Sequence, residues 1–570
     1  MRLKIFFITL SLMFLLVLLR LAYMQLIMGG YYRQLSAKNC IRLIARQARR
    51  GTVYDRNGII LAENLPSYDV VIIPQDFQEP EAGFVFLSRA LQKDRQELVK
   101  HFRLNRNAPF APVVVAKNIS REQAIKIEEN KNQYPGISVQ VNAKRAYPLA
   151  SVSSHILGYV GEIDRFRITR LKDYGYKLKD MVGYGGIEEY YDNFLRGEDG
   201  GVQIVVDNRG RQVRMLGMRS PTAGKDIRLT IDARIQKICA EALSGFKGAA
   251  IFMDPKNGEI LGMVSSPAFD PNVFVERYAP DLLSGYFQDQ QAPLLNRAVS
   301  GLYAPGSVFK VVTALAALEQ GKVSAVTSFF CNGSYQLGNR QFACTQKHGL
   351  QDLRLAFAHS CNVYFYHLGR LAGPEALSRL AYELGFGQTA GLDLPAQAQG
   401  IIPSPIQKRM ARKENWYPGD TLNFSIGQGE LLVTPLQLTI MMATVVNGTF
   451  AARPHLVKEV AGRQPAVIGR QKRLKIKPQN LEIVRRDLRA VVSEPTGTAH
   501  ILNIENLKVA GKTGTAQVGQ GRPHAWFVGF FPYQEPKMVF AVFLENGGSG
   551  YNACVVAREI LRRMVEEKIL

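Results

Sequence analysis

The strongest constraint on the fold lies at the N-terminus, where residues 5–19, IFFITLSLMFLLVLL, carry no charge. Together with RLAYMQLIM, which follows, this segment is long enough to cross about 30 Å of hydrocarbon at roughly 1.5 Å per helical residue. It predicts one membrane-spanning helix, so that residues 1–28 form a cytoplasmic stub and a transmembrane anchor. The sequence contains no second segment of comparable length and apolarity. We therefore expect the remaining residues, about 540, to lie on one side of the membrane.

A cleaved signal peptide is the alternative interpretation of this segment. The stretch that follows it, MQLIMGGYY, offers no A-x-A-like site of small residues for signal peptidase. Arg2 and Lys4 precede the apolar run, and basic residues before a first helix favour a cytoplasmic N-terminus. The pattern predicts a single-pass protein with most of its chain outside the cytoplasm.

Length and charge limit the class of protein further. A chain of 570 residues is expected to form several structural units, and 46% hydrophobic with 21% charged residues excludes a disordered or fibrous protein. The net charge of +23 raises the question of nucleic-acid binding, but the basic residues are spread along the chain and match no nucleic-acid-binding signature. Basic charge outside the cytoplasm suits anionic lipid or an anionic polymer precursor, with solubility alone as the alternative.

Strand and helix patterns divide the chain after the anchor into two regions. Residues 29–225 mix short strands and helices, with a hairpin at Asn57-Gly58 and an amphipathic helix bounded by glycines over 183–201. From residue 248 two strand patterns flank a turn at 255–258, and helical patterns then continue to about residue 445. Three strand patterns and a helix end the chain. This order predicts an α+β domain over 226–570, in which one sheet is completed by segments far apart in sequence.

The pattern S-x-x-K occurs twice, at Ser307–Lys310 and at Ser244–Lys247. Ser244 ends a helical pattern and is followed by a glycine and a strand, so its hydroxyl and the lysine are not expected to share a helix face. Ser307 instead begins SVFKVVTALAALEQG, which predicts a buried helix ending at Gly321. Residues i and i+3 share a helix face, and burial lowers the pKa of a lysine. Lys310 is therefore placed to act as the base for a serine nucleophile.

Two further motifs follow in the chain. SCN, residues 360–362, is the only S-x-N and lies in the helical stretch LRLAFAHSCNVYFYHLG. KTGT, residues 512–515, is the only K-T-G and lies in a strand pattern, where glycine allows a substrate backbone to approach closely. Taken alone, the S-x-N motif is a polar helix face and the K-T-G motif is a bulged strand. Together, and in this order, the three motifs indicate one catalytic site.

These motifs resemble those of penicillin-binding proteins and serine β-lactamases. The resemblance extends over almost the whole chain to class B penicillin-binding proteins, because several more segments are similar: RRGTVYDRNGIILAEN, GGIEEYYDNFLRGEDG, SSPAFDPN, NRAVSGLYAPGSVFK, SIGQGELLVTPLQL and HAWFVGFFP. Residues 415–429, NWYPGDTLNFSIGQG, resemble the elongation branch, penicillin-binding protein two. The resemblance implies an elongated pedestal (dimerisation-like) domain over 29–225. Over 226–570 it implies a serine β-lactamase-like transpeptidase domain with an antiparallel sheet flanked by helices.

The same resemblance implies a peptidoglycan D,D-transpeptidase that crosslinks stem peptides during cell elongation and rod-shape maintenance, with weak carboxypeptidase activity as a side reaction. Ser307 would attack the carbonyl of a D-alanyl-D-alanine stem peptide or of a β-lactam, and Lys310 would accept its proton. Ser360 would relay a proton to the leaving D-alanine, while Asn362 would hydrogen-bond the substrate amide. An amine of a neighbouring stem peptide would then resolve the acyl-enzyme and form the crosslink.

The K-T-G strand would bind the other end of the donor peptide. Lys512 would supply positive charge, and Thr513 and Thr515, on either side of Gly514, would hold the terminal carboxylate. Backbone N–H groups of Ser307 and Thr515 would form the oxyanion hole. None of these steps needs a cofactor.

The family also implies partners and a location. The partners would be nascent glycan strands, β-lactams, the membrane, a SEDS-type (RodA-like) glycosyltransferase and rod-shape scaffold proteins, with no nucleic acid. The location would be the bacterial inner membrane, with the bulk of the chain periplasmic. A β-lactamase is a competing interpretation, but it must activate a deacylating water and is usually a small soluble domain. A β-lactam sensor or a non-catalytic scaffold of the elongation complex would keep the fold without turnover.

Three of the six cysteines lie close together in residues 331–361, with the spacing C-x12-C-x3-H-x12-C. Cys331, Cys344, His348 and Cys361 form a Cys3His set that suits a structural, tetrahedral zinc ion. Some elongation-type relatives resemble this in carrying a metal site beside the S-x-N motif, partly with aspartates in place of cysteines. A Cys331–Cys344 disulfide and three unlinked thiols are the alternatives. The other cysteines are expected to be isolated thiols: Cys40, Cys239 and Cys554.

Overall fold

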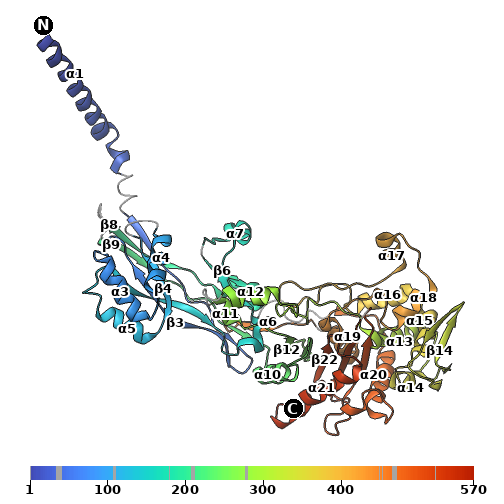
Figure 1. Ribbon diagram of the computed structural model, residues 1–570. Coiled ribbons are helices and arrows are strands. Elements are labelled where there is room, and N and C mark those ends of the chain that lie inside the picture. Colours follow the sequence, from blue (N-terminus) through green and yellow to red (C-terminus); the bar gives the residue numbers. More distant parts are fainter. Residues whose placement is uncertain are drawn as a thin grey trace. The chain divides into compact units, whose positions relative to one another are not determined.

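The chain folds into two compact units, shown as a ribbon in Figure 1. The computed structural model describes residues 2–33, 41–106, 111–178, 180–206, 212–275, 280–448, 450–451, 453–464, 472–519 and 521–570. The first unit contains Met1–Arg50, Asn64–Lys144 and Arg196–Gly224, and the second contains Gly51–Glu63, Arg145–Leu195 and Lys225–Leu570. Three segments of the chain therefore belong to the second unit, and two of them lie before residue 225.

The apolar N-terminal segment is helical, as predicted. Helix α1 spans Arg2–Ala22 and continues into a π-helical turn, Tyr23–Ile27. Within the described ranges, Leu3–Ile27 is the one helix that is long and apolar enough to cross a membrane. Its apolar side chains are exposed in the structure, as expected for a helix whose solvent is lipid.

The first unit has its own small core of strands and helices. Strands β4 (Val113–Ile119) and β5 (Ile137–Ala146) both pair with β3 (Ile60–Ile72). Three helices bury apolar side chains against these strands: α3 (Pro80–Leu91), α4 (Arg95–Asn105) and α5 (Arg121–Glu129). A separate antiparallel sheet has the order β1 (Ile41–Arg46), β8 (Gly200–Val206), β9 (Gln212–Arg219).

Two predictions about the early part of the chain have different outcomes. The hairpin at Asn57-Gly58 is confirmed, since β2 (Val53–Tyr54) pairs antiparallel with β3 across it. The single amphipathic helix over 183–201 is wrong. After strand β7 (Met181–Tyr184), the chain forms two short helices, α8 (Gly186–Tyr190) and α9 (Asp192–Leu195). The break is stabilised by Asp192, whose carboxylate accepts a hydrogen bond from Gly183 N–H at 2.9 Å, a tertiary contact that helical periodicity does not report.

The second unit is organised around a five-stranded antiparallel sheet with the order β12-β11-β22-β21-β20. Its strands are β11 (Gly248–Met253), β12 (Ile260–Ser266), β20 (Ala510–Ala516), β21 (His524–Phe531) and β22 (Met538–Leu544). Strand β11 pairs with β22 in a register that aligns Gly248 with Leu544. The predicted sheet, completed by segments far apart in sequence, is confirmed, and every residue of β21 is buried.

Helices cover this sheet, and most of them lie in the sequence between β12 and β20. Helix α21 (Gly550–Glu566) packs on β20–β22, α10 (Ala233–Ala242) packs on β12, and α19 (Pro435–Asn447) packs on β11, β21 and β22. Helix α13 (Lys310–Glu319) has nine buried residues, in agreement with the predicted buried helix. The remaining helices of the central block are α14 (Leu353–Ala358), α15 (Asn362–Ala372), α16 (Pro374–Glu383), α17 (Pro405–Arg412), α18 (Pro418–Ser425) and α20 (Pro478–Ser493).

Short elements complete the described structure. In the second unit these are α6 (Ser154–Leu157), β6 (Tyr159–Glu162), α7 (Arg165–Leu171), β10 (Ile227–Leu229), α11 (Pro271–Val275), α12 (Pro280–Gln288), β13 (Phe329–Cys331), β14 (Ser334–Leu337), β15 (Arg340–Ala343), β16 (Gly349–Gln351), β17 (Phe450–Ala451), β18 (Val457–Val460) and β19 (Lys472–Arg473). Strands β13 to β16 lie between α13 and α14 in the chain and form two small antiparallel pairs, β13 with β16 and β14 with β15. They carry the cysteine-rich segment.

Candidate active site

Ser307 lies on a single 3-10 turn, Gly306–Phe309, that leads directly into α13. Gly306 has a φ of 53°, and a Cβ at this position would lie 2.7 Å from the carbonyl oxygen of Thr515. Glycine therefore allows the turn to lie against strand β20. In a 3-10 helix, residues i and i+3 eclipse one another, so Ser307 and Lys310 share a face although the α-helix begins three residues later than predicted. Ser307 is half-buried, and Lys310 is completely buried.

Lys310 joins the first two motifs through hydrogen bonds. Its Nζ donates to the carbonyl oxygen of Ser360 at 2.7 Å, to Ser360 Oγ at 3.2 Å and to Asn362 Oδ1 at 2.7 Å. Burial lowers the pKa of Lys310 to about 8. An amine with such a pKa is available as a neutral base near physiological pH, which is what an adjacent serine nucleophile needs.

The S-x-N motif does not lie within a helix, contrary to the prediction. Helix α14 ends at Ala358 and α15 begins at Asn362, so Ser360 and Cys361 form the turn between them, and Ser360 has a φ of 55°. The carbonyl oxygen of Ala358 accepts from the backbone N–H of Thr498 at 3.0 Å, a contact that stabilises the end of α14. The turn lets the Ser360 carbonyl and the Asn362 side chain reach the same amine.

The K-T-G motif lies on the edge strand β20. Lys512 is completely buried, and its Nζ donates to the carbonyl oxygen and to Oγ1 of Thr513 at 3.2 and 3.3 Å. Burial, together with the charge of Lys310, holds the pKa of Lys512 well below its usual range. Thr515 Oγ1 accepts from the N–H of Gly550, the first residue of α21, at 2.9 Å. Its own O–H therefore remains a donor.

Gly514 has a packing role as well as the predicted role of leaving space for substrate. A Cβ at Gly514 would lie 2.8 Å from the carbonyl oxygen of Pro305 and 2.9 Å from Val308 Cγ2, both in the segment around Ser307. The two close approaches, at Gly306 and Gly514, hold the nucleophile turn and β20 together. The structure thus gathers all eight predicted catalytic and substrate-binding residues in one region: Ser307, Lys310, Ser360, Asn362, Lys512, Thr513, Gly514 and Thr515.

Thr498 is a residue of this site that the sequence did not reveal. Its Oγ1 shares a hydrogen bond with Thr513 Oγ1 at 2.8 Å, while its backbone N–H binds the end of α14. Two residues earlier, Thr496 Oγ1 lies 3.0 Å from His359 Nε2, beside the S-x-N turn. The segment therefore connects the second and third motifs. The available signal was the polar, turn-forming stretch EPTGTAH between α20 and β20, which has no motif of its own.

The second S-x-x-K copy lies away from these groups. Ser244 follows the end of α10, Gly245 has a φ of 83°, and β11 begins at Gly248. The prediction that Ser244 and Lys247 do not share a helix face is confirmed. Asp270 immediately precedes α11, and its Oδ1 accepts a hydrogen bond from the N–H of Asn272 at 2.9 Å.

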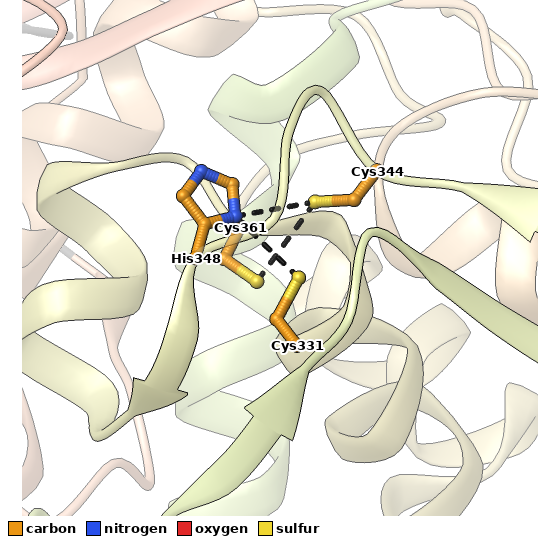
Figure 2. A group of neighbouring side chains, drawn as sticks. All are labelled: Cys331, Cys344, His348 and Cys361. Carbon is orange, nitrogen blue, oxygen red and sulfur yellow. Dashed lines mark hydrogen bonds between the residues drawn. The ribbon is translucent and has the colours of Figure 1, made fainter.

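The four residues of the predicted Cys3His set meet at one point (Figure 2). Cys331 ends β13, Cys344 and His348 lie between β15 and β16, and Cys361 immediately precedes α15. His348 Nδ1 lies 3.5 Å from the Sγ atoms of both Cys331 and Cys344, and the Cys344 and Cys361 Sγ atoms are 3.9 Å apart. All four ligand atoms lie within 4.8 Å of one another.

This arrangement fits a tetrahedral zinc ion. Zn–S bonds of about 2.3 Å and Zn–N bonds of about 2.0 Å place neighbouring ligand atoms roughly 3.5 to 3.8 Å apart. A hydrogen bond from the Cys361 thiol and backbone N–H groups hold the pKa of Cys344 well below its usual range, so Cys344 is poised to be a thiolate ligand. The same bond raises the pKa of Cys361. His348 Nε2, facing away from the cluster, is buried and has no hydrogen-bond partner among the described residues.

The other cysteines are unlinked where they are described. Cys239 and Cys554 are buried free thiols, in agreement with the prediction, and Cys40 lies outside the described residues. The three cysteines of the cluster are also free, so the alternative Cys331–Cys344 disulfide is not present in this structure.

Comparison with known families gives two matches along the chain. Residues 248–566 match the penicillin-binding protein transpeptidase domain, and residues 45–229 match the penicillin-binding protein dimerisation domain. Among named proteins, the chain is 32% identical to the peptidoglycan D,D-transpeptidase MrdA of Acinetobacter baumannii, over 95% of this chain and 84% of that protein.

Solved structures give the same result. A penicillin-binding protein PBP2 from Helicobacter pylori, in a complex with MreC, superposes with a TM-score of 0.83 at 28% identity, over 93% of this chain and 99% of that chain. A chain from a peptidoglycan synthase complex, described as coordinating polymerization and crosslinking, superposes with a TM-score of 0.75 at 30% identity, over 98% and 97% of the two chains.

Proposed function

Because this chain belongs to the penicillin-binding proteins, in the class B elongation-type branch, we propose that its Ser307 forms the acyl-enzyme of a peptidoglycan D,D-transpeptidase. The reaction crosslinks stem peptides during cell elongation. The observation that carries the assignment of residues is the position of Lys310 Nζ, 2.7 Å from both the Ser360 carbonyl oxygen and Asn362 Oδ1 and on the same face as Ser307.

Acylation begins with the transfer of the Ser307 proton to the neutral amine of Lys310. Ser307 Oγ attacks the carbonyl carbon of the penultimate D-alanine, and the negative charge that develops on the carbonyl oxygen is held by the backbone N–H groups of Ser307 and Thr515. The peptide bond breaks, and the proton returns through Lys310 and Ser360 Oγ, 3.2 Å apart, to the leaving D-alanine. The product is an ester of Ser307.

Substrate binding uses the polar groups around the nucleophile. Thr513 and Thr515 donate hydroxyl hydrogen bonds to the terminal carboxylate, and Lys512 supports Thr513 from behind. Thr498 is a positioning residue, since its hydroxyl group fixes that of Thr513. Asn362 Nδ2 is the donor for the peptide carbonyl of the donor strand. An acceptor amine then attacks the ester, and Lys310 receives its proton.

The proposed partners follow from the relatives. A scaffold protein similar to MreC and a SEDS-type glycosyltransferase are assigned because two of the solved relatives are a PBP2–MreC complex and part of a peptidoglycan synthase complex. Residues 1–28 form the anchor of a single-pass inner-membrane protein, with the basic N-terminus cytoplasmic. Residues 29–225 serve as the pedestal and residues 226–570 as the periplasmic transpeptidase domain.

The penicillin adduct is expected to persist after excess drug is removed. Within the described part of the chain, no carboxylate pairs or hydrogen-bonds with Lys310, Ser360, Asn362 or Lys512, so a base for deacylation by water is missing from these contacts. Intact-mass measurements over several hours provide the test. Rapid loss of the adduct with multiple-turnover hydrolysis of penicillin would instead indicate a β-lactamase.

The Cys3His cluster is assigned as a structural zinc site. Cys331, Cys344, His348 and Cys361 would hold the ion. The ion would link the segment between β13 and β16 to the turn that carries Ser360 and Asn362. Four protein ligands leave no open position for substrate or water. The site therefore positions the S-x-N turn and takes no part in bond breaking.

Protein purified without chelator is expected to contain close to one zinc per chain by elemental analysis. Removal of the metal, or Cys361→Ser, should lower the acylation rate without abolishing it, because the ion only holds the turn. Cys239→Ala, at a buried position on α10, is the matched control and should keep the zinc content. Less than about 0.2 zinc per chain, with Cys331 and Cys344 linked in a peptide map, would rule the site out.

A further inference from the structure

Among the described thiols, Cys344 and Cys361 are the one pair whose sulfur atoms lie within hydrogen-bonding distance of each other. Their Sγ atoms lie 3.9 Å apart. We propose that these two residues are a redox-sensitive site, at which a disulfide oxidant reversibly links Cys344 to Cys361 when zinc is absent and thereby slows acylation at Ser307. The consequence for acylation rests on the proposed function, whereas the formation of the bond does not.

The geometry selects this pair over the alternative that the sequence suggested. A disulfide needs an S–S distance of about 2.05 Å, so the two sulfurs must approach by roughly 1.9 Å. The contacts of Cys331 Sγ are instead with His348 Nδ1 at 3.5 Å and the Gln346 carbonyl oxygen at 3.6 Å. Cys344 is the one partly exposed thiol of the cluster, while Cys331 and Cys361 are buried. An external oxidant therefore meets Cys344 first.

The chemistry is a thiol–disulfide exchange in two steps. Cys344 loses its proton to the medium, and its sulfur attacks one sulfur of a small disulfide such as oxidised glutathione, which forms a mixed disulfide and releases one thiol. Cys361 loses its proton to the medium and attacks Cys344 Sγ, which forms the internal disulfide and releases the second thiol. The two cysteines lose two electrons, and the oxidant gains them. Zinc, when bound, would be held by both sulfurs and would oppose the first step.

The pair is directly connected to the catalytic turn. Cys361 lies between Ser360 and Asn362, and the backbone N–H of Asn362 donates to Cys344 Sγ at 3.2 Å. Movement of Cys361 toward Cys344 displaces both residues that hold Lys310 Nζ, namely the Ser360 carbonyl and the Asn362 side chain. A displacement near 1 Å of a catalytic group costs roughly 10- to 100-fold in rate.

The test uses the purified full-length chain in detergent, either zinc-loaded or stripped with chelator, and treated with oxidised glutathione. Peptide mapping, thiol counting and released zinc are measured beside the rate of labelling by fluorescent penicillin. The stripped protein should lose two thiols and yield a Cys344–Cys361 linked peptide. Its labelling rate should fall by about 10- to 100-fold and recover after reduction and zinc addition. The zinc-loaded protein should oxidise more slowly.

Two variants separate the disulfide from general oxidation. Cys344→Asp keeps a possible zinc ligand and cannot form the bond, so its labelling rate should be the same with and without oxidant. Cys239→Ala should respond as the unmodified chain does. A Cys331–Cys344 linkage, or a Cys344–Cys361 linkage that leaves the labelling rate unchanged, would overturn the inference. Absence of labelling in the fully reduced, zinc-loaded protein would instead contradict the proposed function.

Discussion

Ser307→Ala is expected to lower covalent labelling by penicillin by at least about 10⁴-fold, because no other oxygen replaces Oγ as the attacking atom. The half-buried serine lies on a turn whose shape depends on Gly306 and on the contacts of Lys310, so the substitution should leave the fold intact. Labelling with fluorescent penicillin, followed by mass spectrometry of the digested adduct, gives the measurement. Circular dichroism and thermal unfolding monitor the fold.

Ser244→Ala is the matched control, since it removes the serine of the second S-x-x-K copy. Its labelling rate should equal that of the unmodified chain, because Ser244 follows α10 and precedes a glycine with a φ of 83° rather than a catalytic helix. A penicilloyl group found on any serine other than Ser307 would show that the motif has been assigned to the wrong copy.

Lys310→Met should lower the second-order rate of acylation by about 10²- to 10⁴-fold. The substitution keeps a long apolar side chain at a completely buried position, but it removes the base and the three hydrogen bonds to Ser360 and Asn362. Stopped-flow or quenched labelling measures the rate. A variant that labels at the normal rate would mean that another group accepts the Ser307 proton.

The pH dependence of acylation distinguishes a base from a merely structural lysine. Burial lowers the pKa of Lys310 to about 8, and only the neutral amine accepts a proton. The rate should therefore rise as pH increases from 6 and level off above about 8. Lys310→Met should lose this dependence. A wild-type rate that does not change between about pH 6 and 9 would contradict the role of Lys310.

The fold of the second unit could be predicted in outline because each of its main strands and helices has a local sequence pattern. Strand patterns at 248–266 and after residue 508, separated by helices, predict a shared sheet. The pairing of β11 with β22 is known only from the structure. The break at Ser360 could not be predicted in this way. It depends on contacts from Thr498 and Lys310, which lie 138 and 50 residues away and leave no trace in the periodicity of 353–372.

The candidate site was predictable wherever a residue type is rare or its spacing is fixed. Unique S-x-N and K-T-G motifs and the Cys3His spacing identified groups that the structure brings together. Thr498 was missed because a threonine in a polar loop is ordinary until its distance of 2.8 Å from Thr513 is known. Likewise, sequence spacing gave no reason to pair Cys344 with Cys361 rather than with Cys331.

Crosslinking of nascent glycan strands is the direct assay for transpeptidation at Ser307. The purified full-length chain is incubated with uncrosslinked glycan carrying D-alanyl-D-alanine stem peptides, and the muramidase-digested products are separated and weighed. We expect peptide-linked muropeptide dimers, one D-alanine released for each crosslink, and loss of both with Ser307→Ala. Release of D-alanine without any dimers, or dimers that still form with Ser307→Ala, would contradict transpeptidation at Ser307.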